Sequence, residues 1–249
     1  MEPFKKEDIL KIYKSENAGR KALEKYSHLF PIRPSERIAG IIGDIFGDGH
    51  MQGNPKWRFD YTSKSIKELK RFEKEIYKEF KIKGKIRECK TNMWGTTYNY
   101  GVNSKVISRV LFSFGAPVGN KVLNPLKIPK WILNDKRFFR RFIQRLFDCE
   151  GTVDSQGAIE LQMWKSQALK DQGFEFFNSI KSHLKEYFDI ETTNVFTDKR
   201  TNLRKDGIRT MALRMKIRRK GDIEKFFKHI NFENNEKKHK LQLLVRRAD

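Results

Sequence analysis

Apolar residues recur every three or four positions in several stretches of the chain and alternate with polar ones in others, which predicts both helices and strands. One helix is predicted from Glu36 to Asp48, with Ser35 as its N-cap. Another is predicted from Ile66 to Phe80, because four apolar residues fall on one face: Leu69, Phe72, Ile76 and Phe80. The rest of this half predicts strands at 57–62, 81–89 and 96–102 and a helix at about 104–115.

The second half of the chain repeats this order. A helix capped by Asn134 or Asp135 runs to Glu150, a strand follows at 158–164, and a long helix covers 168–187. Two further strands are predicted at 192–197 and 209–217, then helices at 223–230 and from about Glu236. Both halves are read as α-β-β-α-β-β-α, and an order repeated after about 100 residues indicates an internal duplication.

Four segments follow from this reading. Residues 1–33 form a helical N-terminal extension, 34–116 the first half, 117–135 a proline-containing linker and 136–249 the second half. Within the extension, two short helices are predicted around Asn17-Ala18-Gly19. Such a pair could be a helix-turn-helix, but a simple packed extension is the favoured interpretation.

Charge and composition narrow the class of protein. The 249 residues contain 53 Lys and Arg against 31 Asp and Glu, a net charge of +22, with 38% hydrophobic residues. The chain is too apolar for a disordered polycation, so a folded body carries a field that favours nucleic acid or an anionic membrane surface. It holds no apolar run of membrane-spanning length and no signal peptide. Cys89 and Cys149 form no CxxC pair, which predicts two reduced, buried thiols in a cytoplasmic protein.

Two helix ends carry the candidate chemistry. The segments Gly40–Gly49 and Phe142–Gly151 each place an acid, Asp48 or Glu150, at the predicted last helical position, followed by a glycine expected to end the helix. At Gly49 the chain is expected to turn left-handed. The helix dipole disfavours an acid there by about 0.3–1 kcal/mol. Two such acids at matching places of a duplication indicate a task that needs negative potential, and divalent-cation binding is the simplest.

The first of these helices also has a stripe without bulk at Ala39, Gly43 and Gly47. Glycine within a soluble helix costs about 1 kcal/mol relative to alanine, so close approach of another helix is expected there. If the second helix is that partner, Asp48 and Glu150 meet at one end. Two neighbouring carboxylates with bound metal are the setting for two-metal phosphodiester hydrolysis.

The two segments resemble the paired motifs of the LAGLIDADG homing endonucleases, in the single-chain form with two motifs. Ile41–Gly49 matches the motif at its small, apolar and acidic positions. Ile143–Gly151 matches more loosely, because Gln144 and Arg145 stand where small residues are usual. The resemblance covers roughly residues 34–249 by element order, although only the two motifs are specific.

This resemblance implies a pseudo-twofold α+β fold, with two antiparallel four-stranded sheets forming a saddle over DNA and the motif helices packed at the centre. It implies a monomeric, intron-encoded or free-standing endonuclease that uses Mg²⁺ (or Mn²⁺) to cleave both strands of a long, asymmetric double-stranded DNA site and leaves 3′ overhangs. By the resemblance, Asp48 and Glu150 would bind the metals, with the carbonyls of Gly47 and Cys149 as further ligands.

The family often places a basic residue at the end of a following strand, near the metals. Lys64 and Lys165 are the candidates, because each follows its motif acid by nearly the same interval, 64 − 48 = 16 and 165 − 150 = 15. His50 directly follows the first motif, but the more common role of such a residue is a plain surface histidine.

Alternation within the strands predicts which residues face the duplex. Polar side chains should line one face of each sheet, where β-surfaces can read base edges in the major groove. The candidates are Arg58, Asp60, Thr62, Lys83, Lys85, Arg87, Gln162, Arg214 and Lys216. Residues 198–206 are predicted as a basic hairpin tip that clamps phosphates through Lys199, Arg200 and Arg204.

Two other functions stay open at this level. An RNA-binding maturase that assists intron splicing could use the same fold and keep the acids as packing relics. A non-cleaving DNA-binding regulator is the other alternative, and the N-terminal helices would help it. The intact acids and both lysines favour the nuclease.

Overall fold

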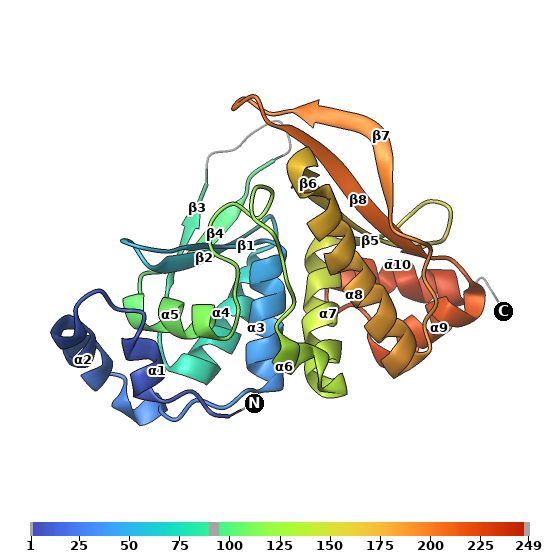
Figure 1. Cartoon of the computed structure of the whole chain (residues 1–249). Helices are drawn as coiled ribbons and strands as arrows, with labels where there is room; N and C mark the ends of the chain where they lie inside the picture. The colour runs from blue at the N-terminus through green and yellow to red at the C-terminus, as the bar shows by residue number, and fades with distance from the viewer. Residues whose placement is uncertain (1, 90–94, 247–249) are drawn as a thin grey trace. The chain divides into compact units, whose positions relative to one another are not determined.

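The computed structural model describes residues 2–89 and 95–246, and the side chains of Lys199 and Arg200 lie outside the described residues. The chain divides into two compact units, Met1–Gly119 and Asn120–Asp249 (Figure 1). The boundary falls near the start of the predicted linker, so most of that linker belongs to the second unit. Each unit is described by itself below.

The first unit consists of helices covering one face of a sheet. The elements in chain order are α1 (Lys6–Leu10), α2 (Glu16–Glu24), the 3-10 turn η1 (Ser27–Leu29), α3 (Glu36–Phe46), β1 (Gly49–Gln52), β2 (Arg58–Ser63), α4 (Ile66–Phe80), β3 (Lys85–Glu88), β4 (Tyr98–Val102) and α5 (Lys105–Ser113).

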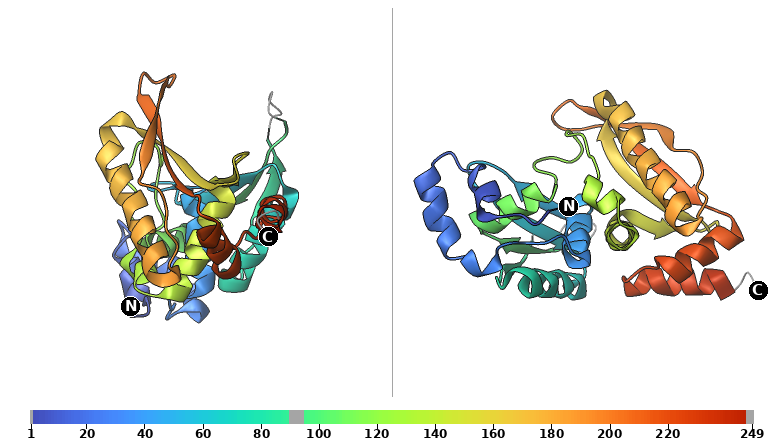
Figure 2. Two further views of the ribbon diagram at one scale, coloured as in Figure 1. Left: turned by 90° about the vertical axis from the view of Figure 1, so that its right-hand side faces the viewer. Right: turned by 60° about the horizontal axis from the view of Figure 1, so that its bottom comes forward.

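The second unit repeats the helix and strand order that runs from α3 to α5, with one further helix before it and one after it. The elements are α6 (Lys130–Leu133), α7 (Lys136–Glu150), β5 (Gly151–Val153), β6 (Ile159–Ser166), the turn η2 (Gln167–Leu169), α8 (Lys170–Phe188), β7 (Phe196–Leu203), β8 (Arg209–Ile217), α9 (Lys220–His229) and α10 (Asn235–Arg246). Figure 2 shows α9 and α10 lying next to each other, and the two helices are in contact.

The two sheets share one topology, which confirms the predicted α+β duplication. Their strand orders are β1-β2-β4-β3 and β5-β6-β8-β7, and every neighbouring pair is antiparallel. The first pair of each sheet starts from the glycine after the motif acid, with Gly49 opposite Tyr61 and Gly151 opposite Leu161. The short strands β1 and β5 are additions to the strands that the alternation pattern had located.

The core of each unit explains which sheet face is left for function. In the first unit, Phe72 of α4 stacks on Tyr61 with ring centroids 4.8 Å apart and meets Phe59 and Tyr100 edge-on. In the second, Met211, Leu213, Met215 and Ile217 of β8 are buried, and so is the small Ala212 between them. Because strand side chains alternate, the residues between these apolar ones point to the opposite, helix-free face.

Several predicted boundaries change for local reasons. Strand β3 starts at Lys85 rather than Lys81, because Lys81 ends α4 in a left-handed conformation with a φ of 54°. Strand β7 continues to Leu203, so residues 198–203 form strand rather than hairpin tip, and the turn comprises 204–208. The partly exposed Cys89 and Cys149 are free thiols, not the buried ones that were expected.

The N-terminal extension packs onto the first unit. Gly19 lies inside α2 and not in the predicted turn. A Cβ at this position would lie 2.5 Å from the Leu10 side chain, so close packing explains the glycine. Phe4 meets Phe114 edge-on at 4.6 Å, and the Tyr26 hydroxyl lies 3.1 Å from the hydroxyl of Ser104, the N-cap of α5. Among the described residues, no helix is both long and apolar enough to cross a membrane.

Candidate metal centre and nucleic-acid interface

The two motif helices begin as the sequence predicted. Ser35 accepts a hydrogen bond from the backbone N–H of Ile38 at the start of α3, and Asp135 accepts one from the N–H of Arg137 at the start of α7. These caps satisfy backbone donors that have no partner within a helix. Every residue of α3 from Ile38 to Phe46 is buried, including the small residues Ala39 and Gly43.

The two motif helices end at different distances from their acids, and the difference is two residues. Glu150 is the last helical residue of α7, as predicted. The first helix ends earlier, at Phe46, so that Gly47 is its C-cap and the exposed Asp48 lies beyond it. In both cases the acid directly precedes the first strand of its sheet, β1 or β5. That Asp48 and Glu150 meet stays a prediction.

The glycine after each acid is required by close packing, not by a left-handed backbone. At Gly151 the backbone is extended, with a φ of −87°, and Gly49 is absent from the positive-φ residues. A Cβ on Gly49 would lie 2.7 Å from the Cα of Ile45, and one on Gly151 would lie 2.6 Å from the carbonyl oxygen of Phe147. Each first strand therefore turns back tightly against its own motif helix, which replaces the predicted left-handed stop.

Buried acids also lie within the motif helices, one in each. Asp44 is fully buried and accepts two hydrogen bonds from the Arg71 guanidinium on α4, at 2.8 and 3.0 Å. Asp148 accepts hydrogen bonds from Arg145 and from the backbone N–H groups of Glu233 and Asn234. These two acids hold elements together inside their units, a role that the sequence reading missed.

Gln144 and Arg145, the departures from the motif, contact the C-terminal part of the chain. Gln144 donates to the carbonyl oxygen of Ile230 at 2.6 Å, and Arg145 forms an ion pair with Glu233 at 3.1 Å. Both side chains are buried. Their bulk therefore serves to attach the segment between α9 and α10 to the motif helix.

A lysine from α10 reaches the C-terminal end of α7. The Lys237 ammonium donates to the carbonyl oxygen of Asp148 at 2.6 Å and lies 3.3 Å from that of Cys149. A cation is favourable here because the negative end of the helix dipole lies at this point, together with carbonyls that have no partner within the helix. The carbonyl of Cys149, a predicted metal ligand, thus already faces a positive charge.

Lys165 occupies a buried polar cradle. It belongs to the same face of β6 as Leu161 and Met163, and its side chain is almost completely buried. Its ammonium donates to the carbonyl oxygens of Lys121 and, at 2.8 Å, Asn124. Burial is the main cause that lowers its pKa from 10.5 to about 8, and the charge of Lys121 adds to this.

The strand register removes the equivalence expected between Lys64 and Lys165. Tyr61 and Leu161 occupy matching positions, and Lys64 lies 64 − 61 = 3 residues beyond the first, whereas Lys165 lies 165 − 161 = 4 beyond the second. A shift of one residue places a side chain on the other face of a strand. Accordingly, Lys64 is exposed and lies beyond the end of β2, while Lys165 is buried.

A basic groove covers the helix-free face of the first sheet. It has a volume of about 420 Å³, and five of the predicted DNA-contacting residues line it: Arg58, Asp60, Lys83, Lys85 and Arg87. Asn99 lies between them and donates to Asp60 and to the predicted Thr62, each at 3.0 Å. Charged and amide groups that can bind phosphates and base edges are thus gathered on one surface.

The corresponding face of the second sheet is neutralised by its own acids. Lys216 pairs with Asp154 at 2.7 Å and Glu160 at 2.9 Å, which raises the pKa of its ammonium. Arg214, opposite Gln162 in the sheet, lies 3.4 Å from Asp198. In the turn, Arg204 pairs with Asp206 at 2.9 Å, while the side chains of Lys199 and Arg200 lie outside the described residues.

Solved structures share the fold of this chain, although no family model matches its sequence. I-DmoI in complex with its nicked target DNA, in the presence of manganese, has a TM-score of 0.50 at 18% identity, covering 78% of this chain and 95% of that chain. The homing endonuclease I-WcaI bound to its DNA recognition sequence has a TM-score of 0.52 at 16% identity, covering 96% and 98%. Full-length WhiA from Thermatoga maritima reaches 0.50 at 14%, covering 92% and 66%.

The chain has the LAGLIDADG fold.

In sequence, this chain is similar to parts of larger proteins. The replication factor C small subunit of Methanocaldococcus jannaschii is 31% identical over 174 residues, 62% of this chain and 9% of that protein. The tRNA-splicing ligase RtcB of the same organism is 29% identical over 242 residues, covering 87% and 24%. The ligase of Pyrococcus furiosus is 27% identical over 238 residues, covering 86% and 23%. The chain thus spans no more than about a quarter of the length of these relatives.

Within the LAGLIDADG fold, the sequence reading and the structure overlap only in part. Each motif acid directly precedes the first strand of its sheet, and five of the six DNA-contacting residues predicted in the first half line a single groove. The contacts of Arg71 and Lys237 were missed, because an isolated basic residue on an amphipathic helix carries no signal of its buried acceptor. Asp44 alone gave a hint, as a carboxylate inside an otherwise apolar helix.

Proposed function

We propose that this chain is a site-specific endonuclease that hydrolyses both strands of a DNA duplex with divalent metal and leaves 3′ overhangs. The observation that carries the proposal is the repeated placement of Asp48 and Glu150. Each lies at or just beyond the end of a motif helix and directly precedes the first strand of its sheet, in two units of identical topology. A structural duplication has no need to keep an exposed or half-exposed acid at both places, whereas a metal site does.

The donor set at the motif ends fits Mg²⁺ or Mn²⁺. Asp48 and Glu150 would hold the metal with the carbonyl of Gly47, and the Cys149 carbonyl would contribute less because Lys237 lies 3.3 Å from it. Hard divalent cations prefer such oxygen ligands. When bound, the metal would activate water and stabilise the charge that develops on the scissile phosphate.

The groove of the first sheet supplies the affinity for DNA in this proposal. Within the described residues, Lys83, Lys85 and Arg87 have no carboxylate partner, so their charge is available to phosphates and base edges. The paired charges of the second sheet would contribute less. The two sheet faces therefore differ, which suits a long asymmetric site bound by a single chain rather than a symmetric site bound by a dimer.

Lys165 is the basic residue that we assign to the second motif. An amine with a pKa of about 8 can change its protonation near neutral pH, as an acid–base group must. Its two hydrogen bonds to backbone carbonyls fix the ammonium in one place. Lys64 is exposed and takes a phosphate-binding role instead.

The decisive experiment is metal-dependent cleavage of a randomised duplex library by the unmodified chain and by Asp48→Asn and Glu150→Gln variants. Both variants should lose cleavage by at least a thousandfold while duplex binding persists. Glu16→Gln is the matched control, because it neutralises an exposed acid whose ion pair, among the described residues, is with its helix neighbour Arg20. A double variant with Asp48→Asn and Glu150→Gln is tested as well. If it still cleaved the duplex in Mg²⁺ and stopped in the presence of a chelator, Asp48 and Glu150 would not be the metal ligands.

The sequence relatives affect how the alternatives are tested. One chain matching parts of a replication factor and of an RNA ligase behaves as a module that occurs in unrelated proteins, so neither name indicates its activity. Splicing rescue without DNA cleavage would favour the intron maturase. Tight duplex binding without metal-dependent nicking would favour a regulator.

We place the activity in a reducing compartment, the cytoplasm or an organelle, since neither cysteine forms a disulfide.

A further inference from the structure

A second basic groove lies where the N-terminal extension meets the first sheet. It has a volume of about 320 Å³, and its basic residues come from two places. Lys25 and His28 belong to the end of the extension, while Lys81 and Lys83 belong to the connection between α4 and β3. None of the described residues that line it is acidic.

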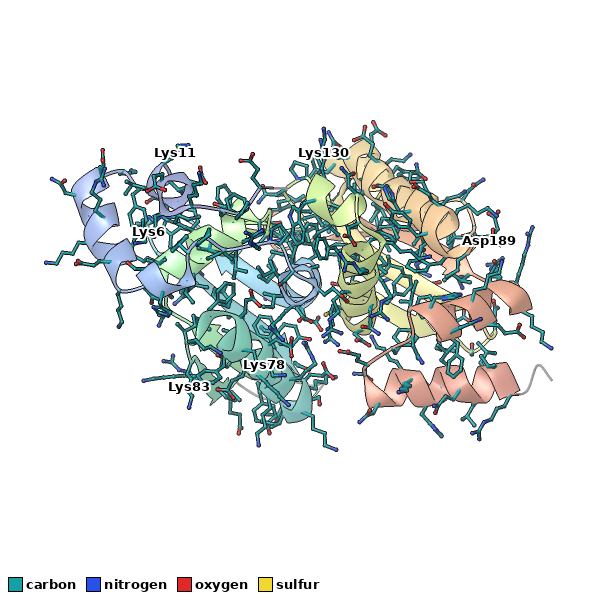
Figure 3. All side chains as sticks on the ribbon, turned by 90° about the horizontal axis from the view of Figure 1, so that it is seen from below. Lys6, Lys11, Lys78, Lys83, Lys130 and Asp189 are labelled. Atoms are coloured by element: carbon teal, nitrogen blue, oxygen red, sulfur yellow. The ribbon has the colours of Figure 1, made fainter. Side chains whose placement is uncertain are left out.

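This groove continues the one on the sheet. Lys83 and Asn103 line both, so the two hollows share a wall. Figure 3 labels Lys83 close to Lys78 of α4, at the outer side of the first unit. A ligand that lies along the sheet and passes Lys83 would therefore next reach the end of the extension.

The extension is held in a fixed position at this point. Tyr26, between Lys25 and His28, places its hydroxyl 3.1 Å from that of Ser104, and Ser104 also caps α5. At the next residue, Ser27, the hydroxyl accepts a hydrogen bond from the Lys6 ammonium at 2.8 Å. Basic side chains on a rigid backbone lose less conformational freedom when they bind a phosphate than those on a loose tail.

The charges of the groove are also available. Lys25, His28 and Lys81 are exposed, and within the described part of the chain neither they nor Lys83 form an ion pair with a carboxylate. Lys81 and Lys83 instead lie over the Tyr77 ring, 5.8 and 5.4 Å from its centroid. An aromatic face orients an ammonium without neutralising it.

We propose that the N-terminal extension lengthens the DNA track, and that Lys25, His28 and Lys81 bind backbone phosphates of duplex DNA beyond the end of the region that the first sheet covers. The inference rests on the proposed function, because it needs the sheet to bind DNA. It gives the extension, which lies outside the LAGLIDADG resemblance, a task of its own. Contacts of this kind add affinity without base specificity.

The test compares two double variants of equal charge. Lys25→Gln with Lys81→Gln removes two groove lysines, and Lys14→Gln with Lys21→Gln removes two exposed lysines of the extension outside the groove. Binding of the full chain to a cognate duplex is measured by fluorescence anisotropy from 50 to 300 mM KCl. Each lost phosphate contact should reduce the slope of log K against log salt by about 0.9, so the groove pair should reduce it by about 1.8 and the control pair by less than half of that.

A second measurement locates the contacts. Hydroxyl-radical footprinting should show protection lost at one end of the duplex in the groove variant only, and shortening the duplex at that end should abolish the difference from the unmodified chain. Equal slopes for both variants, or equal loss of protection along the whole duplex, would overturn the inference while the proposed function stands. No duplex binding by the unmodified chain would overturn both, and stronger binding to duplex RNA at the same groove would replace DNA as the partner.

Discussion

The ammonium of Lys165 lies 2.8 Å from the carbonyl oxygen of Asn124, so a lysine at the end of β6 is tied to the segment that precedes α6. The backbone N–H of Ser166 donates to the carbonyl of Val122 at 2.9 Å and reinforces the connection. The residue predicted as the basic group near the metals of the second motif is therefore also a structural junction within the second unit. Because the pKa of Lys165 is lowered to about 8, its contribution to stability should depend on pH.

Stability should rise with pH because of Lys165. Its pKa is about 8 in the folded protein and 10.5 in the unfolded chain, so between these values the unfolded state holds a proton that the folded state has lost. The free energy of unfolding then increases as pH rises through this window, by at most about 3–4 kcal/mol, since one pKa unit corresponds to about 1.4 kcal/mol. Urea unfolding at pH 7.5, 8.5 and 9.5 should show this increase, and a Lys165→Met variant should lack it.

The control for this prediction is Lys64→Met, which removes an exposed lysine near the end of β2. The pH dependence of its stability should follow that of the unmodified chain. If Lys165→Met kept the full increase, the buried ammonium would not be its source.

The glycines after the motif acids should resist substitution. In Gly151→Ala, the added Cβ would lie 2.6 Å from the carbonyl oxygen of Phe147, and relief requires a shift of backbone. We expect a loss of about 1–3 kcal/mol in the free energy of unfolding, measured by urea titration. Gly221→Ala is the matched control in α9, where a Cβ meets nothing within 4 Å, and should be neutral or stabilising by up to about 1 kcal/mol. Equal effects at the two positions would contradict the close-packing explanation.

The buried pair of Asp44 and Arg71 should contribute far more than surface pairs. Asp44 has a side chain 1% exposed, so Arg71→Met leaves a carboxylate in the core without its guanidinium partner. Breaking such a pair costs about 3–5 kcal/mol. The exposed pair of Arg20 and Glu16 offers the comparison, because Arg20→Met should cost less than about 0.5 kcal/mol. Thermal unfolding of both variants separates the two classes, and similar losses would show that Asp44 is not held by Arg71.

The sequence predicted the elements that carry a long, regular pattern. Helix α4 has the predicted bounds because its apolar positions repeat over four turns, and β8 has them because large apolar residues recur at every second position from Met211 to Ile217. Strands β1 and β5, of four and three residues, are too short to show alternation and are defined by their pairing with β2 and β6. Local pattern therefore specified the long elements, and pairing specified the short ones.

Features of the candidate site that depend on distant neighbours could not be predicted. The intervals of 16 and 15 residues made Lys64 and Lys165 look alike, but the span between the paired residues Gly49 and Tyr61 is two residues longer than that between Gly151 and Leu161, since 61 − 49 = 12 and 161 − 151 = 10. Only the register shows that the two lysines occupy different positions. Likewise, nothing near Arg214 or Lys216 along the chain announces the carboxylates that neutralise them.

That neutralisation leads to a difference between the two sheets in DNA binding. Lys85→Gln with Arg87→Gln removes two groove charges that have no carboxylate partner within the described residues. Arg214→Gln with Lys216→Gln removes two charges that already pair with Asp198, Asp154 and Glu160. Because a paired cation releases fewer counterions from DNA, the first variant should flatten the log–log salt dependence of duplex binding by nearly 2 and the second by less than 1. Anisotropy titrations at four salt concentrations measure both slopes, and a larger change for the second variant would show that its ion pairs open to bind phosphates.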